Sequence, residues 1–498
     1  MNIFLLDNDY KYAAEQMMLM LFPGERPVYP ASVLDDGGAR CVTLRLRYGR
    51  TYTTAICYLT YDGRHAKACA RIHTDRLGGA LERPRQEQRL LKLAFYRAAI
   101  SLGVPKPEWG CLTGVRPAKL LAGLIHRDGL SEAAAVRMLT GTFDVSKERA
   151  SLALAAERAA AKAEATLAPE DVCLYIGIPY CPTRCAYCSF VSVDAPKLLK
   201  SIPDYLDALE KEMHAAAAAV KAAGRRIVAV YIGGGTPTTL TASQLDRLLA
   251  DTKACFDLSA CREFTVEAGR PDTVTEEKFA VLVSHGVDRV SVNPQTMSDA
   301  VLEAIGRHHT VAEVREAVAM VKKFPQLAFN MDLIAGLPGD TPETFAETVR
   351  EVIELGAENI TVHTLALKKG SRFLTEGTAL PDGKAVGKML GAAREMLEAA
   401  GYAPYYLYRQ KFMSGSFENV GWTKPGYENL YNICIMEELC GILAVGAGGS
   451  TKLTAPGGVV KRLMAPKYPR EYMDRIVQTC AEKDEIVRFY NSEPKGTN

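Results

Sequence analysis

Short apolar runs alternate with amphipathic stretches of helical length through the middle of the chain, and this rhythm limits the possible folds more than any other feature. The apolar runs are Val172–Ile178, Ile227–Ile232, Glu263–Glu267, Arg289–Val292, Ala328–Ile334 and Asn359–Thr364. The amphipathic stretches are Asp204–Ala223, Ser243–Cys255, Glu276–His285, Val311–Phe324, Thr341–Leu355 and Lys384–Ala400. Six strand-helix repeats predict an α/β fold with parallel strands, either an open sheet or a partial (β/α)6 TIM-like barrel. Functional side chains are then expected at the carboxyl ends of the strands.

Residues 1–165 have a different pattern. Alternating polar and apolar residues at Arg40–Tyr48 and Tyr52–Tyr61, with a third segment ending near Ile72, predict a small antiparallel meander. Helical spacing follows at Arg83–Leu102 and in the Ala-rich stretch Asp144–Leu167. We therefore expect an amino-terminal α+β domain over 1–165, a barrel over 166–400, and a carboxy-terminal extension over 401–498 that covers the substrate.

Composition excludes several classes of protein. The 60 Lys and Arg against 58 Asp and Glu leave a formal charge of +2, without the basic patch that nucleic acid or an anionic membrane would attract. No apolar run approaches the ~18 residues of a membrane span. The amino end carries Asp7 and Asp9 where a secretion signal would be basic and then apolar, so we expect a cytoplasmic protein.

Three of the 13 cysteines, Cys181, Cys185 and Cys188, lie within eight residues directly after the first predicted strand. A closed zinc site commonly uses two CxxC pairs, and no second pair follows. Three thiolates suit a four-iron, four-sulfur (4Fe-4S) cluster whose fourth iron is left open to another ligand. Zinc with a distant fourth cysteine, such as Cys173, is the alternative. The other ten cysteines are interpreted as small buried hydrophobic residues.

Polar or glycine-rich segments follow the other strands. The second strand ends in Gly233-Gly-Gly235-Thr236-Pro237, where backbone can approach a ligand without side-chain interference. The third ends at Glu267, and Asn293-Pro-Gln295 follows the fourth. The fifth strand carries Asp332, which must be hydrogen-bonded to something specific if it is buried.

The spacing C-x3-C-x2-C after a first strand, with an aromatic residue before the last cysteine, resembles the signature of the radical S-adenosylmethionine (SAM) superfamily. That resemblance implies a partial TIM barrel with a 4Fe-4S cluster at its carboxyl mouth. It also implies that Cys181, Cys185 and Cys188 bind the cluster and that SAM chelates the open iron. One-electron reduction of this SAM then gives a 5'-deoxyadenosyl radical.

The array from Tyr175 to Ala366 resembles the oxygen-independent coproporphyrinogen III oxidase group, in which two SAM molecules occupy the barrel. By this resemblance, Tyr175, Gly234 and Glu267 contact the cluster-bound SAM. The residues implied to contact the second SAM are Tyr187, Gly235, Thr236, Gln295, Arg307, Asp332 and Ala366.

Within that group the sequence is most similar to the HemZ branch, through a CSF sequence at Cys188–Phe190 and a WGxLTGVRPxKL segment at Trp109–Leu120. An oxidase of the HemN type carries a further cysteine at the position of Phe190. The HNxxYW haem motif of HemW chaperones is absent from Glu428–Ile433. The HemZ resemblance implies decarboxylation of coproporphyrinogen III to protoporphyrinogen IX, with electrons from a low-potential donor such as a flavodoxin or ferredoxin.

The propionates of such a substrate call for cationic side chains, and Tyr402, Tyr405, Tyr406 and Tyr408 are candidates to face its macrocycle or to pack in the core. The candidate cations are Arg307, Lys368, Lys369, Arg372 and Arg409. A haem-trafficking protein and a radical SAM enzyme with another substrate are the alternative functions.

Overall fold

A computed structural model describes residues 1–30, 40–80, 82–114, 116–188, 193–194, 198–367, 371–410 and 414–492. The chain forms two compact units. The smaller comprises Met1–Val115, Gly123–Leu154 and Gly415–Phe417, and the larger comprises Arg116–Ala122, Ala155–Ser414 and Glu418–Asn498. The division into three functional parts at 165 and 400 stays a prediction.

The smaller unit contains a four-stranded sheet in the order β1-β2-β3-β4. Strands β2 (Arg40–Tyr48), β3 (Tyr52–Tyr61) and β4 (Arg64–His73) form the predicted antiparallel meander. The sequence interpretation missed β1 (Asn2–Leu6), which pairs with β2 in parallel. The helices here are α1 (Lys11–Leu21), α2 (Arg83–Ser101) and α4 (Glu132–Thr142), while α5 (Lys147–Glu164) leads onward along the chain.

The larger unit is built on an 11-stranded sheet whose central strands are parallel, in the order β12-β11-β10-β9-β8-β5-β15. The six predicted strands are all present. They are β5 (Asp171–Ile178), β8 (Arg226–Gly234), β9 (Glu263–Glu267), β10 (Arg289–Ser291), β11 (Ala328–Ala335) and β12 (Asn359–Thr364). The partial TIM-like fold is thus confirmed, with β15 (Gly441–Val445) as an unpredicted seventh parallel strand beside β5.

Antiparallel strands extend the sheet at both ends. At one end β14 (Asn419–Thr423) pairs with β12, and β13 (Ala403–Tyr408) pairs with β14. At the other, β16 (Ser450–Ala455) and β17 (Val459–Met464) follow β15 as a hairpin. The carboxy-terminal extension therefore contributes strands to the barrel sheet at both ends. A separate two-stranded pair joins β6 (Tyr180–Cys181) and β7 (Val193–Asp194).

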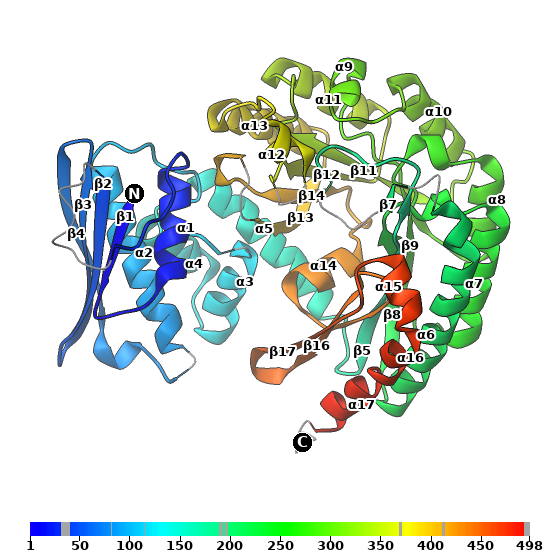
Figure 1. Ribbon diagram of the computed structural model, residues 1–498, viewed down its shortest axis with the longest axis horizontal. Coiled ribbons are helices and arrows are strands. Elements are labelled where there is room, and N and C mark those ends of the chain that lie inside the picture. The colour runs from blue at the N-terminus through cyan, green and yellow to red at the C-terminus, as the bar shows by residue number, and fades with distance from the viewer. Residues whose placement is uncertain are drawn as a thin grey trace. The chain divides into compact units, whose positions relative to one another are not determined.

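Helices form an outer arc around the parallel strands (Figure 1). They are α6 (Ile202–Ala222), α7 (Ala242–Cys255), α8 (Glu276–Ser284), α10 (Val311–Val321), α11 (Pro342–Glu354) and α13 (Gly383–Ala399). Three of them begin at a capping box, in which Thr241, Thr310 or Thr341 accepts a hydrogen bond from the backbone three residues later. These local signals explain why the predicted helix starts are close to the observed ones.

The remaining helices are shorter. They are α3 (Pro117–Ala122), α9 (Asp299–Ala304), α12 (Arg372–Glu376), α14 (Leu430–Glu437), α15 (Pro469–Asp474), α16 (Ile476–Ala481) and α17 (Asp484–Asn491). Helix α14 lies on the inner side of the strands, opposite the outer arc (Figure 1). Among the described residues, every helix is too short or too polar to span a lipid bilayer.

Candidate functional site

A cavity of about 490 Å³ opens at the carboxyl ends of the parallel strands, a volume typical of small-molecule sites. Every residue that the sequence analysis assigned to the cluster or to SAM lines this cavity. These residues are Tyr175, Cys181, Cys185, Tyr187, Cys188, Gly234, Gly235, Thr236, Glu267, Gln295, Arg307, Asp332 and Ala366. Segments nearly 200 residues apart thus meet at one edge of the sheet, as expected for strand-end residues.

The backbone after β8 holds the cysteine loop in place. The amide of Gly235 donates to the carbonyl of Ile178 at 2.7 Å, and the amide of Thr236 donates to the carbonyl of Tyr180 at 2.7 Å. A Cβ on Gly235 would lie only 2.5 Å from the carbonyl oxygen of Tyr180, so only glycine allows this approach. The Cys181 Sγ lies 3.4 Å from Thr236 Oγ1, which fixes the first cysteine against the same segment.

Arg270, which the sequence analysis did not identify, supports the middle of the cysteine loop. Its guanidinium is 1% exposed and donates to Thr183 Oγ1 at 2.8 Å. It also binds both carboxylate oxygens of Asp272, at 2.9 and 3.0 Å, and lies 4.0 Å from Cys185 Sγ. Arg270 therefore orients the loop and places a positive charge beside one cysteine.

The other side of the loop is anchored at Ala186. Its amide donates to the carbonyl of Ile305 at 3.0 Å, and its carbonyl accepts hydrogen bonds from the Arg372 amide and the Ser371 hydroxyl. Arg372, a candidate propionate cation, thus contributes its backbone here, and its side chain is exposed.

Glu267 lies at the end of β9 with its carboxylate facing the cavity. The Tyr231 hydroxyl donates to one oxygen at 2.5 Å, and the amide of Gly234 donates to the other at 3.3 Å. Burial raises the pKa of Glu267 to about 7, although these hydrogen bonds oppose the shift. The carboxyl group lacks a cationic partner among these contacts, so a ligand that brings a positive charge would stabilise its ionised form.

Three tyrosines form a stack along this wall of the cavity. The ring centroids of Tyr231 and Tyr431 are 4.5 Å apart, and Tyr175 lies 6.3 Å from each of them. The interplanar angles range from 16° to 23°. The stack gives the site a flat aromatic wall next to Glu267.

Arg307 is buried at the cavity wall and is oriented by oxygen atoms from three segments. It donates to the carbonyl of Asn293 at 2.8 Å, to the carbonyl of Gly269 at 3.4 Å and to the Tyr187 hydroxyl at 3.2 Å. Its Nε has no hydrogen-bond partner among the described residues. Arg307 therefore holds a positive charge at the cavity wall, where it can attract an anionic ligand group.

Gln295 has a strained backbone, with φ of +71° in the left-handed region. Strand β11 holds it there, because its amide donates to the Asp332 carbonyl at 3.0 Å and its carbonyl accepts from Ile334 at 2.9 Å. Strain of this kind in a non-glycine residue often marks a functional site. The sequence predicted Gln295 at this site but not its conformation.

Asp332 is partly buried on β11 and has specific partners, as its position on an apolar strand required. Asn330 Nδ2 donates to it at 2.7 Å, and His363 Nε2 lies 3.8 Å away. Burial acts to raise the pKa of Asp332, but the interactions with His363, Asn330 and Thr361 outweigh it and lower the pKa. A negative charge thus faces the cavity that Arg307 also lines.

The tyrosines near β13 divide between the core and the site. Tyr402, Tyr405 and Tyr406 are buried, and Tyr406 and Tyr408 line the cavity. Arg409 is buried rather than solvated. The candidate cations Lys368 and Lys369, together with Phe190, lie outside the described residues.

Cys173 does not lie with the cysteine loop. It lies on β5 beside Cys434 and Cys440, and the Sγ atoms of these three are all within 4.8 Å of one another. The structure therefore does not support zinc bound by the loop with Cys173 as its fourth ligand.

The residues present fit a thiolate-bound cluster and a zwitterionic ligand. Three thiols lie on one loop at the cavity, and Gly234 has φ of +111° where a Cβ would crowd the Tyr175 hydroxyl at 3.1 Å. Glu267, Asp332 and the unpartnered Nε of Arg307 supply charges of both signs for amino and carboxylate groups. These features match a cavity for an amino-acid-like ligand beside a metal cluster.

Comparisons with known proteins agree with this chemistry. The model of the Radical SAM superfamily matches residues 175–352. The oxygen-independent coproporphyrinogen-III oxidase-like protein HemZ of Bacillus subtilis is 38% identical over 382 residues, which cover 76% of this chain and 76% of HemZ. The heme chaperone HemW of Haemophilus influenzae is 32% identical over 302 residues, covering 60% of this chain and 75% of HemW.

Among solved structures, the coproporphyrinogen III oxidase HemN from Escherichia coli aligns with a TM-score of 0.52 and 20% identity. The alignment covers 66% of this chain and 81% of HemN. At this identity the likeness establishes a shared fold.

Proposed function

Because the chain belongs to the radical SAM superfamily, within the coproporphyrinogen oxidase-like group that includes HemZ, we propose that it decarboxylates coproporphyrinogen III to protoporphyrinogen IX without oxygen. Members of the superfamily use a 4Fe-4S cluster and SAM, and the expected residues for both are present here. The observation that carries the proposal is the convergence of the three loop cysteines, Glu267, Arg307 and Asp332 on one cavity.

In this proposal Cys181, Cys185 and Cys188 hold the cluster. Arg270 orients their loop through Thr183 and lies close to Cys185 Sγ. Its buried charge partly offsets the negative charge that thiolate ligands bring to this part of the cavity.

Glu267 and Gly234 would bind the first SAM. The Glu267 carboxylate would accept a hydrogen bond from the SAM amino group, and Gly234 adds no side chain beside it. Tyr175 packs against the bound molecule from the aromatic wall. These groups fix the orientation of SAM and exclude water from the reacting end.

Arg307 and Asp332, which carry opposite charges and line the same cavity, would bind the second SAM. Arg307 donates hydrogen bonds to a carboxylate, and Asp332 accepts them from an amino or hydroxyl group. The other residues of this second position would be Tyr187, Gly235, Thr236, Gln295 and Ala366.

The substrate step requires removal of hydrogen from an unactivated carbon. When bound, the cluster and SAM supply the one-electron chemistry that acid-base side chains cannot perform. Two propionate side chains would each lose CO₂, one hydrogen atom that passes to the SAM-derived radical and one electron that passes to a separate acceptor, and so become vinyl groups. The chain seats the anionic propionates near cationic groups and holds the reacting carbon in a dry site. A low-potential flavodoxin or ferredoxin provides the electrons.

Heme trafficking is the second candidate, since HemW proteins are also relatives of this chain. The segment aligned with their haem motif forms the start of α14. Asn429 caps this helix by accepting a hydrogen bond from the Asn432 amide at 2.7 Å, and its Nδ2 donates to Thr265 at 3.2 Å. A helix cap that is tied into the core favours a structural role for this segment over haem ligation.

The extent of the alignments also favours the HemZ branch. The match to HemZ covers 76% of the chain. Residues after 165 form only about two thirds of the 498, so this match includes part of the amino-terminal portion.

The test is an anaerobic turnover assay of the reconstituted full chain with SAM, a reductant and coproporphyrinogen III. We expect protoporphyrinogen IX and two 5'-deoxyadenosine molecules per product, and neither with Cys185→Ala. A parallel titration with haem tests the second candidate. Cleavage of SAM without decarboxylation, together with saturable stoichiometric haem binding, would replace the enzymatic proposal with the trafficking one.

A further inference from the structure

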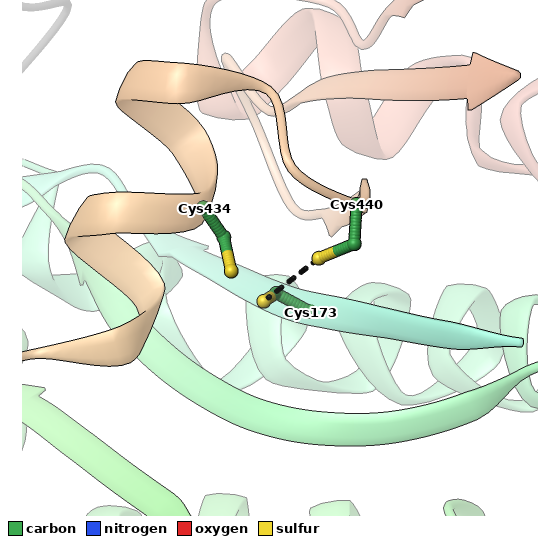
Figure 2. A group of neighbouring side chains, drawn as sticks. All are labelled: Cys173, Cys434 and Cys440. Atoms are coloured by element: carbon green, nitrogen blue, oxygen red, sulfur yellow. Dashed lines mark hydrogen bonds between the residues drawn. The ribbon is translucent and has the colours of Figure 1, made fainter. Parts of the chain in front are cut away.

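Cys173, Cys434 and Cys440 converge inside the larger unit. Figure 2 shows their side chains pointing toward one another from a strand, a helix and the loop after that helix. All three Sγ atoms lie within 4.8 Å of one another, and those of Cys173 and Cys440 are 3.7 Å apart. We refer to these residues as the thiol triad.

The fold brings the triad together through a tight turn at the end of α14. Glu438 adopts a left-handed conformation with φ of +59°, and the amide of Leu439 donates to the carbonyl of Cys434 at 3.3 Å. The Glu438 carboxylate is held by Arg116 at 2.7 Å and Lys119 at 2.6 Å. This turn reverses the chain so that Cys440 faces Cys434 and enters β15 beside Cys173.

The surroundings of the triad are apolar and closed to water. Cys173 and Cys434 are 0% exposed, and Cys440 is 6% exposed. Their buried neighbours include Ala229, Ile442 and Tyr431. Because Tyr431 also lines the cavity, the triad lies behind the wall of the candidate active site.

The spacing of the sulfurs matches a metal-bound arrangement. With a metal–sulfur bond of about 2.3 Å, neighbouring sulfurs are ~3.8 Å apart in a tetrahedral site and ~4.0 Å apart in a trigonal one. The 3.7 Å between Cys173 and Cys440 is close to both values. The thiols therefore need only small side-chain rotations to share one ion.

The donor set decides which class of ion fits. Structural zinc almost always takes four ligands. The group formed here by the described residues offers three, all sulfur. Soft thiolates favour Cu(I), zinc and iron–sulfur clusters over hard ions, and three sulfurs fall short of the four ligands that closed zinc and iron–sulfur sites take. We propose that the thiol triad binds one soft monovalent metal ion of the Cu(I) class, at a site separate from the 4Fe-4S cluster.

The test isolates the triad from the cluster ligands. In the full chain carrying C181S/C185S/C188S, Cu(I) is titrated anaerobically against the chromophoric chelator bicinchoninate. We expect one tightly held Cu(I) per chain, with an X-ray absorption spectrum that shows sulfur alone in its first shell. Cys440→Ser in this background is expected to weaken binding by more than ~100-fold, beyond the usual effect of losing an outer-shell partner.

Cys261→Ser is the matched control, because its thiol is partly buried but bonds to the Glu263 carbonyl outside the triad. It is expected to leave Cu(I) uptake unchanged. Cys434→Ala gives a second test if Cys440→Ser unfolds, and far-UV circular dichroism checks the fold of each variant.

The proposal would be overturned by failure to retain Cu(I) against the chelator, by equal retention in the Cys440→Ser variant, or by preferential retention of Zn²⁺ when both ions are supplied. Copper bound with oxygen or nitrogen in its first shell would equally remove the assignment to the triad.

Discussion

Replacing Glu267 by Gln should make the cluster-free protein progressively more stable than the parent as pH rises. Glu267 is half-buried at the cavity and its pKa is raised from 4.5 to about 7, with desolvation as the main cause. Glutamine keeps the size of the side chain but cannot ionise. Glutamine can accept a hydrogen bond from only one of Tyr231 and Gly234, but this loss does not change with pH, so the pH-dependent part of the comparison reports the cost of burying the carboxylate.

The size of the effect follows from linkage between protonation and folding. A carboxyl group whose pKa is higher in the folded state binds its proton more tightly there. Its contribution to the free energy of unfolding therefore falls as pH rises from about 4.5 to about 7. One pKa unit corresponds to ~1.36 kcal/mol, so the full shift amounts to ~3.4 kcal/mol. About 2.5 kcal/mol of this lies between pH 5 and pH 8. Between pH 5 and pH 8, the free energy of unfolding of the variant should rise by that amount relative to the parent.

Urea unfolding monitored by Trp422 fluorescence measures the unit that contains Glu267. Trp422 is buried in β14, and the other of the two tryptophans, Trp109, belongs to the smaller unit. Trp109→Phe in every protein compared therefore makes Trp422 the only reporter. Glu277→Gln, which removes a carboxylate from an exposed position, is the control for the loss of one negative charge.

A stability difference between the Glu267→Gln variant and the parent that stays constant from pH 5 to pH 8 would refute the reasoning. A second arm adds SAM to the reconstituted parent. If the SAM amino group lies against Glu267, SAM should stabilise the parent more at pH 8 than at pH 6. In the Glu267→Gln variant, the stabilisation by SAM should no longer depend on pH.

Other changes test the remaining assignments. Cys185→Ala should abolish the visible absorption of the reconstituted cluster while Cys255→Ala retains it, and equal loss in both would contradict the ligand assignment. Arg270→Met should weaken cluster retention by ~10-fold or more, because the cysteine loop loses its buried support. Retention is measured as iron per chain after gel filtration, and an unchanged iron content would show that the loop does not need Arg270. Asp332→Asn should lower bound SAM from two molecules per chain to one in equilibrium dialysis, and an unchanged ratio would remove Asp332 from the second position.

The sequence predicted those parts of the fold and site that depend on local patterns. Short apolar runs between amphipathic stretches of helical length located the six strands, and residues at their ends were brought to one cavity because parallel strands share an edge. Gly235 was predicted from its position after a strand, and the close approach to Tyr180 gives the physical reason for it.

The features that were missed depend on contacts between distant segments. Arg270 is one of 60 basic residues, and its contact with Thr183 arises only when β9 and the cysteine loop meet. The thiol triad joins Cys173 to two cysteines more than 260 residues later. Neither arrangement leaves a periodic pattern in the chain.

The pairing of β5 with β15 also constrains when the protein can become functional during its synthesis. One edge of β5 is completed by Gly441–Val445, and the other by β8. On the ribosome, β8 is synthesised soon after the cysteine loop, whereas β15 follows some 260 residues after the loop. At ~5–20 residues per second this interval lasts tens of seconds at the slower rates. The loop proposed to bind the cluster therefore acquires its complete framework only near the end of translation, which favours cluster insertion into the finished chain.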